Sequence, residues 1–266
     1  MTVDSAELVV ETPYIWRARR PDARHRLICF PHAGAGAGAY AEWADLLPPE
    51  IELVAVQLPG RQNRIMEDPF TETGPLVRVL AQALRPILNS PVLDGSFAFF
   101  GHSCGAVMAY ELARVLRGRG TAGPGHLFFS AQPAPQLFDQ VPRLHDLTDE
   151  EFREEVARLG GLDPEIAEDD DVMDALLPTL RADFEMWEQH PVAPGEPLDI
   201  PITVLSGRDD PRAPGTTVEG WREHTTGPFH AEYYPGGHFY FLDAPAEVVG
   251  FLGQSLLTPS LTGRVS

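Results

Sequence analysis

The hydrophobic pattern of the chain alternates between two kinds of segment. Short apolar runs rich in β-branched and aromatic residues recur, and such runs are typical of strands that are buried on both faces of a parallel sheet. The expected strands cover residues 27–30, 53–57, 97–100, 127–130, 202–206 and 231–234. Segments with helical periodicity lie between them, at residues 40–47, 76–88, 106–116, 215–223 and 246–256. This alternation predicts an α/β fold with a mostly parallel, doubly wound sheet that is covered by helices on both faces.

One region, residues 149–189, breaks the alternation because it contains no strand-like run. Phe152, Val156 and Leu159 recur there at helical spacing before a pair of glycines. A second apolar stripe continues around Pro178, which is expected to kink or divide its helix. The pattern therefore predicts a helical insertion, which we assign to residues 137–192, within a single domain that spans residues 1–266.

The cysteine content and the amino terminus bear on the compartment. Only Cys29 and Cys104 occur, so a disulfide framework is not expected. The first thirty residues lack the apolar run of a signal peptide, and no stretch approaches the ~20 apolar residues of a membrane span. We therefore expect a cytoplasmic protein without a membrane partner, and we also expect it to be a monomer.

The net charge of −19 comes from 39 acidic residues and 20 basic residues, all of which are arginine. The excess is concentrated between Asp146 and Glu188, where 16 acidic residues stand against three arginines. A solvated acidic surface is the simplest interpretation of that segment. Because phosphate binding needs a basic surface, a nucleic-acid partner is not expected.

The sequence GHSCG at residues 101–105 matches the G-x-S-x-G pattern of a nucleophile elbow. An expected strand precedes it and an expected helix follows it, which is the context that this turn requires. Glycines two positions on either side avoid clashes where the chain closes, and the central residue stands beside the positive end of the following helix. Ser103 is the candidate nucleophile, although the pattern by itself leaves Cys104 as a second candidate.

A serine hydroxyl needs a base and an orienting carboxylate, which follow it along this kind of chain in the order Asp or Glu, then His. His238 lies in a glycine-initiated loop directly after the last expected strand, and it is the candidate base. The loop after the preceding strand offers both Asp209 and Asp210. The spacing from Gly207 and the proline that follows favour Asp210, with Asp209 as the alternative. The acid would fix the imidazole tautomer and stabilise the imidazolium that forms.

An oxyanion hole needs two preorganised N–H donors. The residue after the nucleophile supplies one, so Cys104 would act through its backbone, and Ala33 in the glycine- and alanine-rich loop after strand 27–30 would supply the other.

The glycine- and alanine-rich loop after strand 27–30 also fits a relaxed dinucleotide-binding pattern. The next strand, however, ends in Gln57 and Leu58, where a Rossmann protein would have an acidic residue. Dinucleotide binding is therefore disfavoured.

Several segments together resemble the type II thioesterases, which are α/β-hydrolases that accompany modular polyketide and nonribosomal peptide synthetases. The resemblance covers residues 16–256, and the segments that carry it are CFPHAGAGAGAY, QLPGRQNRIMEDPFT, GHSCGAVMAYELAR, DEEFREEVARLGG, LLPTLRADFEMWE, SGRDDP and YYPGGHFYFL. QLPGRQNR, with the acidic-proline-phenylalanine turn after it, is the most specific of them. The resemblance implies an α/β-hydrolase fold in which the family's Ser, Asp and His fall on Ser103, Asp210 and His238 and its helical lid falls on the predicted insertion.

This family hydrolyses acyl groups from the phosphopantetheine arm of acyl or peptidyl carrier proteins and so removes stalled or incorrect units. The resemblance implies a carrier protein as the partner and a substrate that brings its own phosphopantetheine, with no metal and no dissociable cofactor. Apolar lid residues are candidates for the wall of the acyl channel, namely Phe184, Met186 and Trp187. The preferred acyl chain and the kind of synthase stay open.

Two other functions are compatible with the same residues. The acyl group can instead pass to an amine, an alcohol or a second carrier thiol, which would make the chain an acyltransferase or a product-releasing thioesterase. A non-catalytic protein that binds synthase components through its acidic insertion is the second alternative, and the complete set of Ser, Asp and His argues against it.

Since a net charge of −19 would repel an acidic carrier, a compensating basic patch is expected. The candidates are Arg17, Arg19, Arg20, Arg24 and Arg26 near the amino terminus and Arg114, Arg117 and Arg119 after the elbow.

Overall fold

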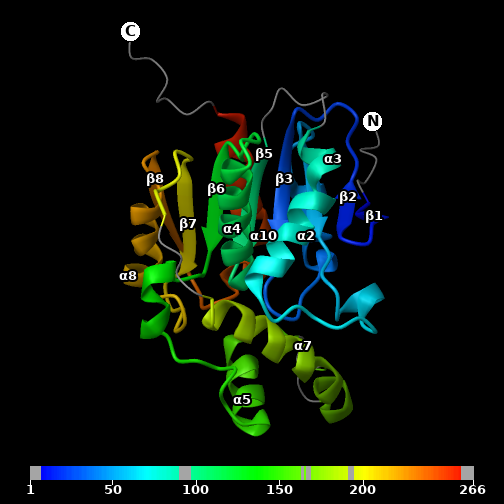
Figure 1. The fold of residues 1–266 in the computed structure, drawn as a ribbon, viewed down its shortest axis with the longest axis vertical. Helices are drawn as coiled ribbons and strands as arrows, with labels where there is room; N and C mark the ends of the chain where they lie inside the picture. Colours follow the sequence, from blue (N-terminus) through cyan, green and yellow to red (C-terminus); the bar gives the residue numbers. More distant parts are fainter. Residues whose placement is uncertain (1–6, 90–96, 163–164, 166–168, 191–194, 259–266) are drawn as a thin grey trace.

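The computed structural model describes residues 7–89, 97–162, 165, 169–190 and 195–258, and it is built around one eight-stranded sheet (Figure 1). The strand order is β1-β2-β4-β3-β5-β6-β7-β8. The strands are β1 (Val9–Thr12), β2 (Ile15–Ala18), β3 (His25–Phe30), β4 (Ile51–Val56), β5 (Phe97–His102), β6 (His126–Ser130), β7 (Ile202–Gly207) and β8 (Phe229–Tyr234). All pairs from β4 to β8 are parallel, whereas β1 and β2 are antiparallel to each other and β2 to β4. The predicted mostly parallel α/β sheet is confirmed.

The apolar runs of the sequence form the buried centre of this sheet. Every residue of β4, β5 and β7 is buried, and Cys29 of β3 pairs with both Ala55 and Phe100 in register. Each methylene that is removed from water in such a core contributes about 0.8 kcal/mol. The apolar pattern does not predict β1 and β2, because each has only four residues and β1 lies partly exposed at the edge of the sheet.

Helices cover both faces of the sheet. In Figure 1, α2 (Thr73–Ala83) and α4 (Cys104–Gly118) lie together in front of the sheet, and α10 (Pro245–Leu257), which contacts α1 (Trp43–Leu46), lies behind it. The expected helix 76–88 is interrupted between α2 and α3 (Arg85–Leu88), and the expected helix 215–223 is divided into α8 (Gly215–Val218) and the 3₁₀ helix η4 (Glu219–His224). The other short helices are α9 (Tyr240–Asp243), η1 (Ala37–Tyr40) and η2 (Gln62–Arg64).

Between β6 and β7 the chain leaves the sheet and forms η3 (Pro135–Gln140), α5 (Asp149–Leu159) and α7 (Asp170–Glu188). Figure 1 shows α5 and α7 beyond one end of the strands. A capping box of Thr148 and Glu151 begins α5, and Gly160 ends it with φ +83°. Residues 163–164, 166–168 and 191–192 of the predicted insertion lie outside the described residues.

Pro178 does not divide α7, contrary to one of the two expectations for this residue. A proline removes one hydrogen bond from a helix, and neighbouring contacts can compensate for that loss. Here the hydroxyl of Thr179 donates to Gly60 O at 2.8 Å, and the side chains of Leu177 and Leu180 are buried. Tertiary packing therefore holds the helix on both sides of the proline.

The described part of the chain contains no helix that combines the length and the apolar character needed to cross a bilayer.

Candidate active site

The strand order changes direction at the centre of the sheet. β3 leads to β4 on one side, and the chain then returns to place β5 on the other side of β3. In open α/β sheets such a switch leaves a crevice at the carboxyl edge of the strands, where ligands bind. The loop after β3 and Ser103 after β5 lie at this point, and both line one cavity.

Ser103 stands in a backbone conformation that few residues other than glycine adopt, with φ +53° and ψ −127°. The turn around it is tight, because a Cβ on Gly101 would lie 2.2 Å from Gly105 O, and one on Gly105 would lie 2.2 Å from Phe30 O. The N–H of Ser103 donates to Ser130 O at 2.8 Å and so ties the elbow to β6. The two glycines of GHSCG therefore allow a turn that presents Ser103 at the cavity wall.

Cys104 is the first residue of α4, and only 1% of it is exposed. Burial raises the pKa of the Cys104 thiol well above its usual range. Since the thiolate is the nucleophilic form of cysteine, this environment makes the sulfur a poor nucleophile. The first N–H groups of a helix have no partner within the helix and lie at its positive end. The position therefore suits a backbone donor to an anion.

His238 and Asp210 meet although they come from different loops. His238 Nδ1 lies 2.9 Å from Asp210 Oδ2, and both side chains are buried. Because a carboxylate accepts and does not donate, Nδ1 carries the hydrogen of this bond, and Nε2 is the ring nitrogen that is left to exchange a proton. Asp210 Oδ1 accepts the N–H groups of Arg212 at 2.8 Å and Ala213 at 3.2 Å. The neighbouring Asp209 is exposed, so the structure places Asp210 and not Asp209 against the imidazole.

The acid loop and the histidine loop approach each other through their backbones. A Cβ on Gly207 would lie 2.1 Å from Gly237 O, and the N–H of Asp209 donates to Gly236 O at 3.0 Å. Glycine at position 207 thus allows a separation that a side chain would prevent. This close contact brings together two residues that are 28 positions apart in the sequence.

The cavity next to Ser103 has a volume of about 320 Å³. Ser103, His238 and Ala33 lie on its wall, and apolar side chains from α5, α7 and the loop before residue 163 form much of the remainder. This wall includes Val156, Leu159, Leu162, Leu176, Leu180 and Phe184. An apolar cavity beside a serine and a histidine suits an acyl chain better than a charged ligand.

The prediction that three residues of α7 line the channel matches this cavity only for Phe184. Met186 and Trp187 do not line it, and both are buried elsewhere. The carbonyl of Met186 accepts a hydrogen bond from the Thr73 hydroxyl at 3.0 Å, and the ring of Trp187 packs on Phe138. Apolar residues on different sides of one helix face different neighbours, so these two contribute to packing rather than to the wall.

Two histidines that the sequence does not single out lie near His238, one in contact with it and the other behind the first. The ring of His102 lies 5.0 Å from that of His238, and His32 contacts His102 edge-on. Burial is the main cause that lowers the pKa of His32 to about 3 and the pKa of His102 well below its usual range. Both rings are therefore neutral at pH 7. Among the described residues, no three His, Cys, Asp or Glu side chains are arranged to hold a metal ion.

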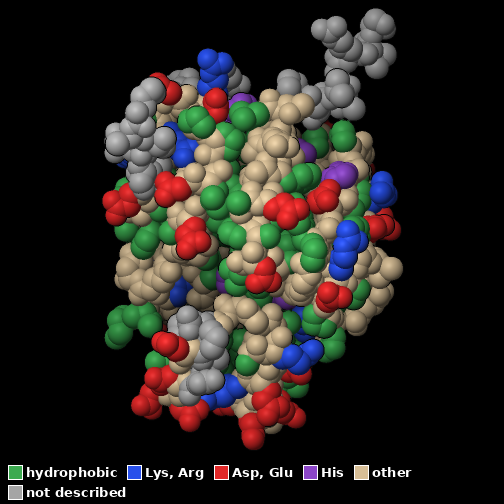
Figure 2. Space-filling model, turned by 180° about the vertical axis from the view of Figure 1, so that it is seen from behind, with side chains coloured by type: hydrophobic (Ala, Val, Ile, Leu, Met, Phe, Trp, Pro, Cys, Tyr) green, Lys and Arg blue, Asp and Glu red, His purple; other side chains and the backbone are tan. Residues whose placement is uncertain are grey.

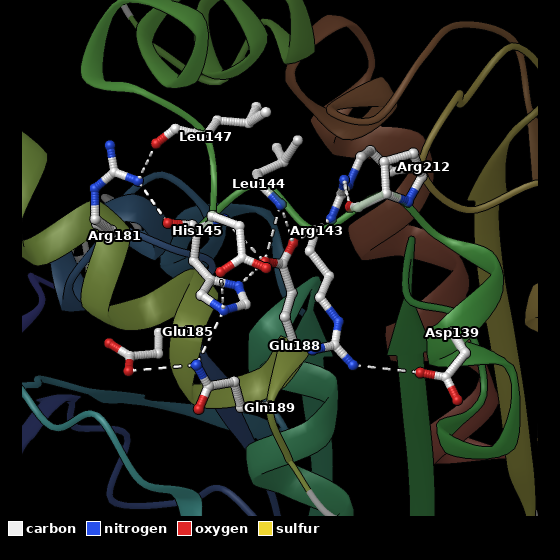
Figure 3. Close-up of polar contacts among 12 residues, drawn as sticks. Asp139, Arg143, Leu144, His145, Leu147, Arg181, Glu185, Glu188, Gln189 and Arg212 are labelled. Carbon is white, nitrogen blue, oxygen red and sulfur yellow. Dashed lines mark hydrogen bonds and ion pairs between the residues drawn. The ribbon is translucent and has the colours of Figure 1, made fainter.

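A buried polar network fixes the end of α7 to the acid loop (Figure 3). Glu188 at the end of the helix accepts Arg212 Nη2 at 2.8 Å, His145 Nδ1 at 2.6 Å and the backbone N–H of Leu144 at 3.0 Å. Arg212 is the residue whose N–H binds Asp210. The sequence gives no signal for this arrangement, because its members come from three segments and the acid of α7 falls within a strongly acidic stretch.

The sequence matches the thioesterase domain family over residues 25–256. The gramicidin S biosynthesis protein GrsT of Aneurinibacillus migulanus is 39% identical over 234 residues, which cover 88% of this chain and 90% of that protein. The solved structure of RedJ, a thioesterase from the prodiginine pathway of Streptomyces coelicolor, has a TM-score of 0.82 and 40% identity and covers 90% of this chain and 92% of its own. BorB, a type II thioesterase from the borrelidin cluster, has a TM-score of 0.83 and 35% identity over 93% of this chain and 99% of its own.

Proposed function

Because the chain belongs to the thioesterase domain family, we propose that it hydrolyses acyl thioesters on the phosphopantetheine arm of an acyl or peptidyl carrier protein. In this role it removes stalled or incorrect acyl groups from a synthase of secondary metabolism. The similarity to a gramicidin S biosynthesis protein, a prodiginine-pathway thioesterase and a type II thioesterase supports this assignment. The family makes the chain a hydrolase, and the residues named below are our assignment of its chemistry.

One observation carries the proposal. Ser103, in the strained elbow, and His238, held by Asp210, line the same apolar cavity. A serine becomes a nucleophile when a neighbouring base accepts its proton and a third group orients that base. The cavity supplies the place where an acyl chain can lie while its carbonyl carbon meets the serine oxygen.

In the first half of the reaction, Oγ of Ser103 attacks the thioester carbonyl carbon while Nε2 of His238 accepts the hydroxyl proton. The negative charge moves to the carbonyl oxygen, which the backbone N–H groups of Ala33 and Cys104 stabilise by about 3 kcal/mol for each donor. The carbon–sulfur bond then breaks, and the pantetheine thiol leaves with the proton that His238 carried. Asp210 stabilises the transient imidazolium through Nδ1.

In the second half, water replaces the thiol. His238 accepts a proton from this water as its oxygen attacks the acyl-serine carbonyl, and the same two N–H groups stabilise the second oxyanion. The bond to Ser103 Oγ breaks, the serine regains its proton, and the carboxylic acid leaves. The proposed reaction uses no metal and no dissociable cofactor, because the phosphopantetheine belongs to the substrate.

The helices α5 and α7 act as a lid in this proposal. They contribute apolar residues such as Val156, Leu176 and Phe184 to the cavity wall. Such a wall excludes water from the acyl chain and leaves the carbonyl next to the donors. Chain length would then be limited by the room between these helices and Ser103.

The test is hydrolysis of a series of acyl groups, each on a carrier protein and on a free pantetheine thioester, by the wild type and by Ser103→Ala and Cys104→Ala. We expect Ser103→Ala to lose about 10³-fold or more in kcat, since the nucleophile is gone. Cys104→Ala should stay within a few-fold, because only its backbone takes part. Mass spectrometry of the released acid measures the reaction.

Product analysis in the presence of an amine, an alcohol or a second thiol separates hydrolysis from transfer. Free acid as the main product supports the proposal, whereas an acylated acceptor as the main product would show a transferase. Rates that do not depend on the carrier would contradict the role in a synthase, and full activity of Ser103→Ala would contradict the mechanism.

A further inference from the structure

A buried carboxylate lies behind the cavity wall. The side chain of Asp183 on α7 is 2% exposed, and Asp183 is not among the residues that line the cavity. Its Oδ2 accepts the backbone N–H of Gly34 at 2.8 Å and Nη1 of Arg61 at 2.5 Å, and its Oδ1 accepts Nη2 of Arg61 at 3.0 Å. One carboxylate therefore joins α7 to the loop that carries Ala33.

This loop has no side chains with which to hold itself, because residues 33–39 are all glycine or alanine. Polar side chains from elsewhere bind its backbone instead. Arg61 Nη1 donates to Ala35 O at 3.3 Å, and Gln57 Oε1 accepts the N–H of Ala37 at 2.7 Å. Asp183 binds Gly34, the residue directly after Ala33, so among these side chains its contact lies nearest to the proposed oxyanion donor.

The helix can come this close because the loop residue is a glycine. Gly34 has φ +75°, and a Cβ on it would lie 2.5 Å from Cδ2 of Leu180 on α7. One position before Leu180, the hydroxyl of Thr179 donates to Gly60 O in the loop that also carries Arg61. The segment 179–183 of α7 is thus fixed to both loops at once.

Pairing Asp183 with Arg61 also matters for the charge near the proposed oxyanion hole. The field of Asp183 reaches Cys104, since after burial it is the next cause of the raised pKa of that thiol. A lone carboxylate at this place would oppose the negative charge that develops on the carbonyl oxygen. The guanidinium of Arg61, which is also 2% exposed, compensates it in a two-bond ion pair.

We infer that Asp183 is a positioning residue of the oxyanion hole, which it fixes by holding Gly34 while Arg61 compensates its charge. The inference rests on the proposed function and extends it, because it makes the helical insertion part of the catalytic apparatus as well as the wall of the pocket. It also assigns a role to Arg61, which belongs to QLPGRQNR, the most specific segment of the resemblance.

The test compares Asp183→Asn with Asp174→Asn, the same change on the same helix at an exposed ion pair with Arg153. The substrate is a short acyl thioester of N-acetylcysteamine, and the transition-state probe is an alkylboronic acid, which forms a tetrahedral adduct with the serine. For Asp183→Asn we expect kcat to fall about 10- to 100-fold and the boronate affinity to fall by a similar factor, with KM changed less than about three-fold. Asp174→Asn should leave all three values unchanged.

A buried ion pair that loses one partner can unfold a protein, so a second variant is needed. Arg61→Met with Asp183→Leu replaces the pair by apolar side chains of similar size, which preserves stability in many proteins, and circular dichroism checks its fold. It still removes the acceptor for Gly34. A folded double variant with a low kcat and weak boronate binding supports the inference, and one with wild-type values of both would overturn it.

The same measurements separate this inference from the proposed function. If the wild type neither hydrolyses the thioester nor binds the boronate, the proposed function fails. If the wild type does both and the Asp183 variants do so equally well, only the positioning role of Asp183 fails. A rise of KM with unchanged kcat would likewise reject it, because that pattern reports substrate binding rather than the oxyanion.

Discussion

Asp209 and Asp210 are adjacent carboxylates in the acid loop, but they differ in burial and in hydrogen-bond partners. Asp210 is 4% exposed, lies 2.9 Å from His238 and accepts two backbone N–H groups, whereas Asp209 is exposed. The spacing of the loop favours Asp210, but the sequence leaves both aspartates available. The choice depends on which side chain the loop turns inward, and that direction is set by backbone contacts such as the approach of Gly207 to Gly237.

Replacing each of these two neighbours tests the assignment of the acid. Asp210→Asn keeps the shape but removes the charge that stabilises the imidazolium and fixes its tautomer, so kcat should fall about 10³- to 10⁴-fold. Asp209→Asn should change kcat less than about two-fold. Steady-state hydrolysis of one thioester by both variants is the measurement, and a larger loss in Asp209→Asn would show that the acid is misassigned.

At the scale of elements, α7 contacts loops on both sides of the cavity. Asp183 accepts the backbone N–H of Gly34 in the loop after β3 and pairs with Arg61, and five residues later Glu188 binds Arg212 in the loop that carries Asp210. A solvated acidic surface is the simplest interpretation of this segment from its sequence, and for most of its acids that interpretation is compatible with their positions. Asp183 and Glu188 are exceptions, because arginines from other loops make their burial possible.

Removing the charge of Glu188 tests how far the acid loop depends on α7. Glu188→Gln leaves the guanidinium of Arg212 buried without its carboxylate, so the free energy of unfolding should fall by about 3 kcal/mol. We also expect a lower kcat, since the backbone N–H of Arg212 orients Asp210. Chemical denaturation and steady-state kinetics measure the two effects.

Glu185→Gln is the matched control, because it makes the same change on the same helix at a partly exposed side chain whose contact is the amide of Gln189 at 3.5 Å. It should change the free energy of unfolding by less than about 0.5 kcal/mol. Equal losses in Glu185→Gln and Glu188→Gln would contradict the role of the buried network.

At the scale of the whole molecule, the charges are distributed unevenly. Figure 2 shows acidic side chains gathered at the end of the molecule that α5 and α7 form. Of the five amino-terminal arginines in the basic patch that the sequence suggests, Arg17 and Arg26 bind Glu52 and Arg20 binds backbone carbonyls such as Leu47 O, whereas Arg19 and Arg24 are exposed. Arg17, Arg20 and Arg26 therefore make contacts within the protein, which leaves Arg19 and Arg24 as the exposed members of this patch.

The buried histidines predict how stability depends on pH. The pKa is lowered to about 3 for His32 and about 4 for His126, and it is well below the usual range for His102, with burial as the main cause in each. In the unfolded chain these groups return to about 6.5. Below that pH the unfolded state binds more protons than the folded state, so the free energy of unfolding is complete above about pH 6.5 and decreases as the pH falls.

The free energy of unfolding should change with pH by about 1.4 kcal/mol per pH unit for each fully buried histidine. The slope should be smaller for His126, which is partly exposed. Urea unfolding at several pH values between 7 and 4.5 measures it. His126→Gln, which does not titrate, should lower the slope by up to one such increment. A free energy of unfolding that stays constant over this range would contradict the prediction.

The sequence by itself determined the features that follow from local residue patterns, namely the strands, the helices and the turn around Ser103. Alternating apolar runs specify the strands and helices of the parallel sheet, and the two glycines of GHSCG specify a turn in which only the central residue can stand out. The resemblance adds the family and the order of Ser103, Asp210 and His238. The strands, the helices and the turn depend on neighbours within a few positions, so a linear pattern can report them.

Only the tertiary structure decided which polar groups are buried together and which apolar residues face the cavity. Asp183 and Arg61 are 122 positions apart, and each is buried in an ion pair with the other. Phe184 lines the cavity while Met186 and Trp187 pack elsewhere, because the orientation of α7 follows from contacts with distant loops. Burial and pairing arise from the packing of separate segments, and no pattern along one segment contains them.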